Sequence, residues 1–355
     1  MSHTDAAQVT QMDIRVPWRV KTAAYRVYQH VCSLLSFIHG KKRSGINISF
    51  FCNYQQATGA TVAIACIANQ LARQHNVDAH IKPLGSFSRQ LSIRVRQYFS
   101  IHSLAGKIIF VDIEQENNTV EQLTREGKQV ILTCHAFPTI LHSVPQQKLA
   151  RNLALSTYIH FVSAYQRAEF IRHYPEINIE SKSFVIPNFT KKSTKTSSTN
   201  SIGIVGLLNR EPKNAMRGIQ LAQLSNARWI ECWGSDKIHG LDDPALYSKL
   251  RINGWTDNLK KMHSTFDVLL SASRSETFGL VVVEALSAGI PCVLSDIPVY
   301  RELYADCKGV VFLSGNAQQD IQSINHLLEQ AQSLKPHITE FWKEHFSNET
   351  IRSIW

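Results

Sequence analysis

SASRSETFGLVVVEALSAGIPCVLSD, residues 271–296, is the stretch of this 355-residue chain that decides the fold. Its start continues an apolar run, 268–272, which predicts a short buried strand before a polar loop. A helix is then expected to begin near residues 278–279 and to end at Ser287, because Gly289 is a typical C-terminal stop and a proline follows it. This order of strand, loop and helix predicts one unit of a parallel α/β sheet.

Two carboxylates flank the start of this predicted helix. Glu276 precedes the helix, and Glu284 lies inside it. Residues 280–283 are all apolar, so the helix should be buried, and an ionised Glu284 would be costly unless something hydrogen-bonds it. The helix start also offers an anion site of free backbone N–H groups, those of Gly279, Leu280 and Val281. An anion site beside two carboxylates that bind hydroxyls fits a nucleotide-sugar; the alternative is that both are ordinary surface charges.

The segment resembles the signature of family 4 of the retaining glycosyltransferases, which have the GT-B fold. That signature has Glu, a short residue and Phe-Gly, then a second Glu with Ala, a small-residue pair with Gly, and Pro. This chain has ETFG at 276–279, EA at 284–285, AG at 288–289 and Pro291. The resemblance implies that Glu276 contacts the transferred sugar and that Glu284 holds the ribose. It also implies that the amides after Phe278 lie close to the diphosphate.

The rest of the chain shows alternating strand and helix patterns on both sides of a segment without large apolar residues, 190–200, which is the expected domain boundary. A first helix is predicted at 59–73. Strands are predicted at 46–52, 79–84, 107–112, 129–134, 158–162, 184–187, 201–206, 228–234, 268–272, 291–295 and 309–313. Such alternation predicts parallel sheets covered on both faces, with ligands bound at the carboxyl ends of the strands.

The resemblance covers residues 46–355 and implies an α/β fold of the GT-B type, with two Rossmann-like parallel-sheet domains that face a cleft. Residues 1–192 are expected to form the acceptor-side domain, with 1–45 as an extension outside the resemblance. Residues 201–334 are expected to form the nucleotide-sugar domain. A C-terminal helix, 335–355, is expected to cross back to the first domain.

Two further candidates stand at predicted strand ends in the first half. Gly59 begins a helix whose N–H groups would face the cleft, and a plain tight turn is the alternative. The family usually has two adjacent glycines here, whereas this chain has Thr58 before Gly59. His135 follows the strand 129–134. In the family a histidine at this place lies beside the donor sugar and can hydrogen-bond its hydroxyls; a structural histidine is the alternative.

Two cations follow the predicted strand 201–206. Relatives place an Arg directly after the strand's glycine and a Lys a few residues later, where they neutralise the diphosphate leaving group. Lys213 fits the second place, and Arg210 is a candidate substitute for the Arg that is missing at Leu207, since a guanidinium binds phosphate in a forked geometry. Solvated surface positions are the alternative for both. No Asp-x-Asp pair is present to bridge a metal and a diphosphate, so neither a metal nor a cofactor is expected.

Positive charge is concentrated in the first half of the chain. Residues 1–195 contain 23 Lys and Arg against 11 Asp and Glu, whereas the remainder contains 15 against 17. This balance favours an anionic partner for the first domain. Within it, 88–102 predicts a basic amphipathic helix that would contact an anionic membrane or acceptor through Arg89, Arg94 and Arg96. The equally open alternative is an element whose apolar face packs on the core.

Cysteine usage and hydropathy indicate the compartment. The seven cysteines are scattered without a Cys-x-x-Cys pair and lie mostly in apolar runs, which is typical of reduced thiols. The first residues are polar, so no secretory signal is expected, and no apolar run is long enough to span a bilayer. The expected location is the cytoplasm, at the inner face of the membrane.

These features predict a retaining, metal-independent hexosyltransferase in which His135, Glu276 and Lys213 act by positioning and electrostatic stabilisation. The donor would be a nucleotide-sugar such as a UDP- or GDP-sugar, and the acceptor a glycan or a lipid-linked molecule. The basic first half suggests the assembly of a surface polysaccharide: lipopolysaccharide, O-antigen or capsule. A GT-B sugar epimerase, a phosphorylase and a non-catalytic protein that binds anionic surfaces stay open as alternatives. No nucleic-acid partner is expected.

Overall fold

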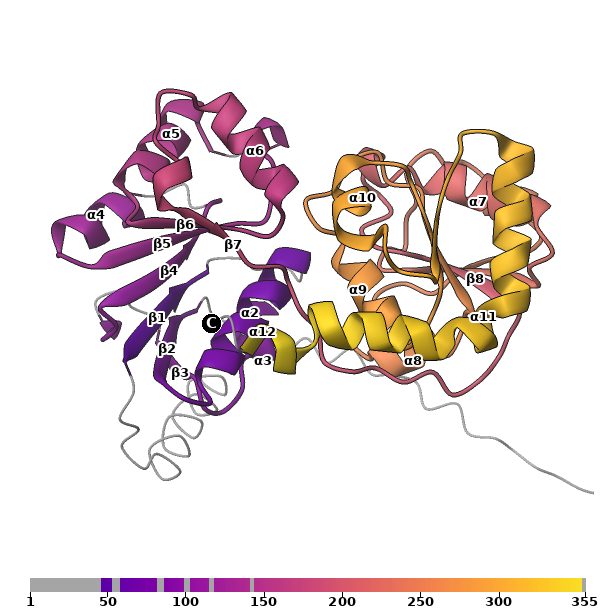
Figure 1. Ribbon diagram of the computed structural model, residues 1–355, viewed down its shortest axis with the longest axis horizontal. Coiled ribbons are helices and arrows are strands. Elements are labelled where there is room, and N and C mark those ends of the chain that lie inside the picture. The colour runs from indigo at the N-terminus through magenta and orange to yellow at the C-terminus, as the bar shows by residue number, and fades with distance from the viewer. Residues whose placement is uncertain are drawn as a thin grey trace, which may run out of the picture.

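The computed structural model describes residues 46–52, 58–81, 86–98, 103–114, 118–140 and 144–352. These residues form two domains, each a parallel β-sheet with helices packed against it, which lie side by side in Figure 1. The predicted α/β class with two parallel sheets is therefore confirmed.

The first domain contains a seven-stranded sheet in the order β3-β2-β1-β4-β5-β6-β7. Its strands are β1 (Asn47–Phe51), β2 (Asn76–His80), β3 (Arg96–Tyr98), β4 (Ile108–Asp112), β5 (Gln129–Cys134), β6 (Tyr158–Phe161) and β7 (Ser183–Val185). Its helices are α2 (Gly59–Leu71), α3 (Ser86–Gln90), α4 (Thr119–Arg125), α5 (Gln146–Leu155) and α6 (Ala164–His173), with 3-10 turns η2 (Pro138–Ile140) and η3 (Glu180–Lys182). The central strands are apolar on both faces, and Phe50 of β1 stacks on Phe110 of β4 at 4.7 Å.

The second domain contains a six-stranded sheet in the order β10-β9-β8-β11-β12-β13. Its strands are β8 (Ser201–Val205), β9 (Trp229–Trp233), β10 (Leu250–Ile252), β11 (Val268–Ser271), β12 (Cys292–Leu294) and β13 (Val310–Phe312). Its helices are α7 (Ala215–Leu224), α8 (Leu259–His263), α9 (Leu280–Ser287) and α10 (Pro298–Tyr304), with 3-10 turns η4 (Glu211–Lys213) and η5 (Pro244–Leu246). Since all strand pairs are parallel, the loops at their carboxyl ends share one edge of the sheet.

The edge strands β3 and β10 were not predicted, and one predicted strand is shifted from its observed bounds. Each edge strand has three residues, one of them an arginine, so neither shows the apolar run that marks a buried strand. The strand predicted at 79–84 is β2, which ends at His80. Most other predicted strands lie within one or two residues of the observed bounds.

The predicted amphipathic helix over 88–102 is wrong. The short helix α3 is followed by a turn and then by the edge strand β3, while residues 99–102 lie outside the described residues. Leu91 and Val95 in this turn are buried and pack in the core of the first domain. The apolar residues therefore face the core, as the alternative interpretation expected.

The segment 190–200 lies along the second domain and is not a free linker. The Lys195 ammonium donates to the Asp267 carboxylate at 2.5 Å, and the Ser193 hydroxyl is hydrogen-bonded to Nδ1 of His263 at 2.9 Å. A polar, low-complexity composition hides these contacts, since each of them depends on residues about 70 positions away in the sequence.

The C-terminal part of the chain connects the two domains. Helix α11 (Ala317–Phe346) is 30 residues long, contains Pro336 and turns sharply toward the first domain in Figure 1. Its Trp342 donates from Nε1 to the hydroxyl of Thr190 at 3.1 Å. Helix α12 (Asn348–Arg352) follows, and its Ile351 is buried in a core cluster of the first domain.

Candidate active site

The start of α9 has the local geometry of an anion site. Gly279 stands directly before the helix in the left-handed region, with φ of 81°, and no side chain caps the helix. A Cβ at this glycine would lie 2.6 Å from Cε1 of Tyr300, so glycine is required both by conformation and by space. The first N–H groups of a helix have no helical acceptor, which leaves those of Leu280 and Val281 as donors for a ligand.

Two buried tyrosines pack against this helix start and hydrogen-bond the residues around it. The hydroxyl of Tyr304 donates to the carbonyl of Phe278 at 2.9 Å, and the hydroxyl of Tyr300 lies 3.0 Å from Oγ of Ser271. Phe278 is also buried. The buried side chains of Phe278, Tyr300 and Tyr304 therefore hold the end of the loop between β11 and α9 in place.

Lys213 and Glu276 form an ion pair in front of α9. Nζ of Lys213 donates to Oε1 of Glu276 at 2.5 Å, and the hydroxyl of Ser273 donates to the same oxygen at 3.1 Å. Their side chains are 23% and 12% exposed, so the pair is partly shielded from water but open to a ligand. Asn214, in the left-handed region with φ of 47°, ends the turn that presents Lys213, and its amide donates to the carbonyl of Ala272 at 3.1 Å.

Three glycines that the sequence analysis did not single out lie at neighbouring strand ends: Gly206, beside Lys213, followed by Gly234 and Gly254. All have positive φ, and Gly234 N–H donates to the carbonyl of Gly254 at 2.7 Å. A Cβ at Gly234 would lie 2.3 Å from the carbonyl oxygen of Gly206, so the loops meet backbone to backbone. Lys213 lies over Gly206, whose Cβ would be 3.8 Å from Nζ. A glycine shortly after each of three neighbouring strands is the signal that could have revealed them.

Glu284 lies in α9, one turn inside the helix start, and burial raises the pKa of its carboxyl to about 7. Within the described part of the chain, its carboxylate has no hydrogen bond or ion pair. Its charge contributes to the raised pKa of the Cys66 thiol, which places Glu284 next to α2 of the first domain. Glu284 is therefore half-ionised near neutral pH and free to accept hydrogen bonds from a ligand.

His135 follows β5 and is joined to the Glu276 loop. Its backbone carbonyl accepts a hydrogen bond from the hydroxyl of Thr277 at 3.0 Å, so the structure brings the first-domain candidate to the second-domain site. Burial, together with the neighbouring His160, lowers the pKa of the His135 imidazole to about 3. Nε2 of His135 is buried without a hydrogen-bond partner among the described residues. A neutral ring with an unused nitrogen suits a hydrogen bond to a hydroxyl.

Gly59 and Arg210 are exposed. Gly59 begins α2, but the hydroxyls of Thr58 and Thr61 already accept the N–H groups of each other's residues at this helix start. Arg210 directly precedes the turn η4 that carries Lys213. Neither has a geometric feature that ties it to a ligand, although Arg210 stands three residues from Lys213.

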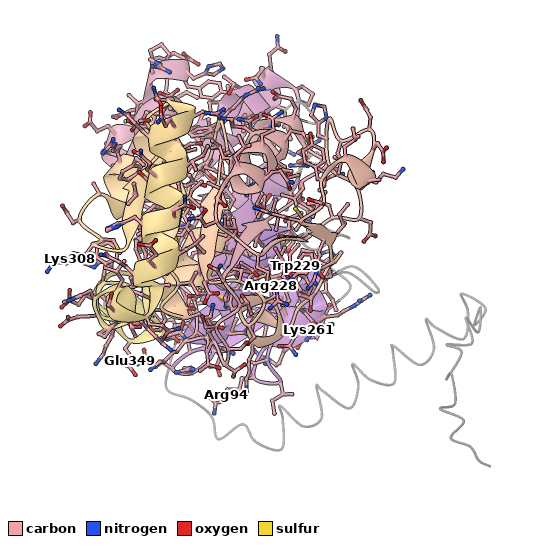
Figure 2. All side chains as sticks on the ribbon, turned by 90° about the vertical axis from the view of Figure 1, so that its right-hand side faces the viewer. Arg94, Arg228, Trp229, Lys261, Lys308 and Glu349 are labelled. Carbon is pink, nitrogen blue, oxygen red and sulfur yellow. The ribbon has the colours of Figure 1, made fainter. Side chains whose placement is uncertain are left out.

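Arg89, Arg94 and Arg96 lie at the far edge of the first sheet. Arg89 and Arg94 are exposed, and Arg94 projects at the lower margin of the molecule in Figure 2. Arg96 pairs with the buried Asp78 at 3.8 Å. Strand β3 is four strands from β5 in the sheet order, which is about 19 Å, so this patch is separate from the site around His135.

No group of acidic, histidine or cysteine side chains among the described residues could hold a metal ion. In the same part of the chain, no helix is both long and apolar enough to cross a membrane. A cavity of about 210 Å³ lies beside Lys195, Lys335 and Gly289. Because Gly289 follows the C-terminal end of α9, this cavity is at the opposite end of the helix from Gly279.

Comparison with known proteins points to the same segment. Residues 246–340 match the glycosyl transferases group 1 family. The chain is similar to the O-antigen biosynthesis glycosyltransferase WclY of Escherichia coli, with 39% identity over 59 residues, 17% of each chain. It is also similar to an uncharacterized 41.2 kDa protein in the cps region of Klebsiella pneumoniae, with 31% identity over 112 residues, 31% of this chain and 28% of that protein. The matches thus span less than a third of either relative.

Solved structures resemble nearly the whole chain. Anabaena HepE, in its crystal structure with UDP and glucose, has a TM-score of 0.67 and 16% identity, over 87% of this chain and 98% of that one. Sucrose-phosphate synthase of Thermosynechococcus elongatus has a TM-score of 0.70 and 14% identity, over 86% and 96%. The chain therefore has the GT-B fold of these structures, and its residues 246–340, which contain both carboxylates of the site, are similar to the glycosyl transferases group 1 family.

Proposed function

We propose that this protein is a nucleotide-sugar-dependent glycosyltransferase that acts with retention of configuration and without a metal ion. The observation that carries the proposal is the Lys213–Glu276 pair in front of the uncapped start of α9, joined through Thr277 to His135. A cation, a set of free backbone donors and a hydroxyl-binding carboxylate meet there, which matches the diphosphate and the sugar of one donor molecule.

The diphosphate would bind at the start of α9 and next to Lys213. As the bond between the anomeric carbon and the phosphate oxygen breaks, the leaving group keeps the electron pair. Lys213 and the N–H groups of Leu280 and Val281 stabilise the charge that develops. The acceptor hydroxyl attacks the anomeric carbon from the same face and transfers its proton to the departing phosphate oxygen. Lys213 is therefore a leaving-group residue, and it exchanges part of its contact with Glu276 for the phosphate.

Sugar recognition would be divided between the domains. Glu276 accepts hydrogen bonds from hydroxyls of the transferred sugar, and His135, neutral because its pKa is lowered to about 3, offers a ring nitrogen from the other side. Glu284 binds the ribose hydroxyls. The glycines at 206, 234 and 254 let the loops pack closely at the strand ends, where the nucleoside would bind. HepE was crystallised with UDP and with UDP-glucose, which makes uridine donors the first to test.

The test begins with thermal shifts in the presence of UDP-, GDP-, ADP- and dTDP-sugars, because a ligand that binds only the folded protein raises the melting temperature. Release of nucleoside diphosphate is then measured with and without acceptor fractions from surface polysaccharide. Acceptor-dependent release supports transfer, whereas release without acceptor and conversion of the donor sugar indicate an epimerase. Absence of any thermal shift with all four donors would contradict the proposal.

The acceptor would be a glycan or a lipid-linked molecule at an anionic membrane surface on the cytoplasmic side, in surface-polysaccharide assembly. The similarity to an O-antigen glycosyltransferase and the basic first half support this choice. Arg89 and Arg94 are the exposed cations of the patch; Arg96 is partly neutralised by Asp78. Replacement of all three by Ala should reduce sedimentation with acidic liposomes at low salt. Unchanged sedimentation would exclude this patch.

A further inference from the structure

A set of hydrogen bonds joins the two domains next to the site, and three residues make it: Ser163, Thr277 and Glu302, which we call the clasp. The hydroxyl of Ser163 donates to the carbonyl of Thr277 at 2.9 Å, and the hydroxyl of Thr277 donates to the carbonyl of His135 at 3.0 Å. Ser163 and His135 belong to the first domain, and Thr277 directly follows Glu276. These two bonds therefore hold the loop that carries Glu276 against the ends of the neighbouring strands β5 and β6.

Glu302 of α10 adds a charged contact from the second domain to the first. Its two carboxylate oxygens accept the backbone N–H groups of Ala164 and Tyr165, each at 2.7 Å. These are the first two residues of α6, so their N–H groups have no acceptor within the helix. A carboxylate at this place also interacts favourably with the helix dipole. One domain thus caps a helix of the other.

Apolar contacts also hold the turn between β6 and α6 against the second domain. Val162, at the end of β6, is fully buried within the core cluster of the second domain, which includes Phe278 and Tyr300. Tyr165 packs against that cluster and meets the ring of Phe137 edge to face at 5.8 Å. The turn between β6 and α6 therefore fits the second domain in shape as well as in hydrogen bonding.

The two bonds that Glu302 makes are open to competition from water. Glu302 is exposed, and its bonds to α6 lie at the surface, where water competes with them. A site lined by residues of both domains must open to admit a donor and to release a product. Thr277 of the clasp directly follows Glu276 in the chain, so the formation of the clasp and the placement of Glu276 are coupled.

We propose that the clasp latches the two domains closed and that Thr277 is a positioning residue, which places Glu276 opposite His135 only in the closed state. The meaning of this latch for sugar transfer rests on the proposed function. The latch itself is a property of the protein without substrate, and it is tested in that form.

Hydrogen–deuterium exchange can measure the clasp directly, because the backbone amides of Ala164 and Tyr165 donate two of the clasp's hydrogen bonds. Glu302→Ala should raise exchange at these amides about tenfold and also raise exchange in the 273–279 loop. Glu329→Ala removes an exposed acid from α11 and serves as the matched control, with no change at either place. Unchanged exchange in Glu302→Ala would overturn the latch.

Thr277→Val removes the hydroxyl but keeps the shape of the side chain, and Thr277→Ser restores the hydroxyl. Exchange in the 273–279 loop should rise in Thr277→Val and return in Thr277→Ser, with the same melting temperature in both and with UDP affinity unchanged. Equal exchange in the two variants would refute the positioning role. If exchange behaves as expected and no donor is ever turned over, the proposed function fails and the latch stands. If exchange does not change, the latch fails whatever the activity.

Discussion

Helices α2 and α9 both follow a strand and begin next to a glycine, yet their N-termini differ. At α2 a reciprocal capping box is present, in which the Thr58 hydroxyl accepts the Thr61 N–H and the Thr61 hydroxyl accepts the Thr58 N–H. At α9 the residue before the helix is Gly279, in the left-handed region, and no side chain caps the helix. The free donors of α2 are thus partly used within the protein, whereas those of α9 are available to a ligand.

The space around the glycines also differs between the two helix starts: Gly59 is open, whereas Gly279 is closely packed. A Cβ added at Gly59 would meet nothing within 4 Å, so nothing in the described structure requires a glycine there. At Gly279 a Cβ would meet Tyr300, and the backbone has a positive φ. The comparison teaches that a glycine between a strand and a helix marks an anion site only where the helix start is also uncapped. We therefore propose that the donor diphosphate binds at α9.

The largest effect should come from the cation beside α9. Lys213→Ala should lower the transfer rate by about 10²–10³-fold, because preorganised charge opposite a leaving group contributes most in the transition state. Affinity for UDP should fall by much less. Glu276→Ala should spare UDP affinity and lower transfer, because it contacts the sugar.

Rates and UDP affinities of both variants are compared with those of Lys237→Ala, an exposed lysine in the loop after β9. Full transfer activity in Glu276→Ala would contradict the assignment. EDTA should leave the parent's activity unchanged if the charge is met by Lys213 and the α9 amides; loss of activity in EDTA would contradict a metal-independent site.

Glycine substitutions test the comparison directly. Gly279→Ala should destabilise the protein by about 2–4 kcal/mol, since it combines a strained left-handed residue with a clash against Tyr300, and it should weaken UDP binding. Gly59→Ala should leave stability equal or raise it by up to about 1 kcal/mol, because alanine favours a helix. Denaturant unfolding and calorimetry with UDP measure both quantities. Equal loss in the two variants would erase the difference between the helices.

The role of Glu284 in α9 can be tested through the pH dependence of stability and of UDP affinity. Burial raises its pKa to about 7, above the ordinary value of 4.5, so the folded protein holds a proton that the unfolded chain releases between these values. This carboxyl therefore makes the unliganded protein less stable as pH rises from about 4.5 through 7. Ribose hydroxyls need the ionised form as acceptor, so UDP affinity should rise from pH 5 to pH 8.

Glu284→Gln should flatten both pH dependences and weaken UDP binding by about ten- to a hundred-fold, as for the loss of hydrogen bonds to a charged group. Calorimetry at pH 5.5 and 8 measures the affinity. A UDP affinity that does not vary with pH in the parent would separate Glu284 from the ribose.

The sequence could predict the elements that have strong apolar patterns. The strand before Glu276, the buried helix after it and the parallel alternation follow from local residue types, because burial on both faces leaves an unmistakable run. The carboxylate pair was visible because both residues belong to one short segment. The edge strands β3 and β10 were invisible because each has only three residues, one of them an arginine.

Contacts between distant residues could not be read from the chain. The Lys213–Glu276 bond joins residues 63 positions apart, and the Thr277–His135 bond joins residues 142 positions apart. The first depends on β8 and β11 being neighbours in the second sheet, and the second depends on how the two domains meet. Likewise, threonine is a residue type that often caps helices, but only the structure shows that Thr58 caps α2 together with Thr61. Only the structure shows that no side chain caps α9.

The smallest expected effect concerns that cap. Thr58→Ala should cost about 1 kcal/mol of stability, since the N–H of Thr61 loses its side-chain acceptor. UDP affinity should stay the same, because the donor diphosphate is assigned to α9. Denaturant unfolding measures the first quantity and calorimetry the second, with Thr58→Ser as a control that keeps the cap. If Thr58→Ala instead changes UDP affinity more than stability, then α2 also contacts the donor. In that case both helix starts would bind the donor, and Gly59 would again be a candidate donor-binding residue.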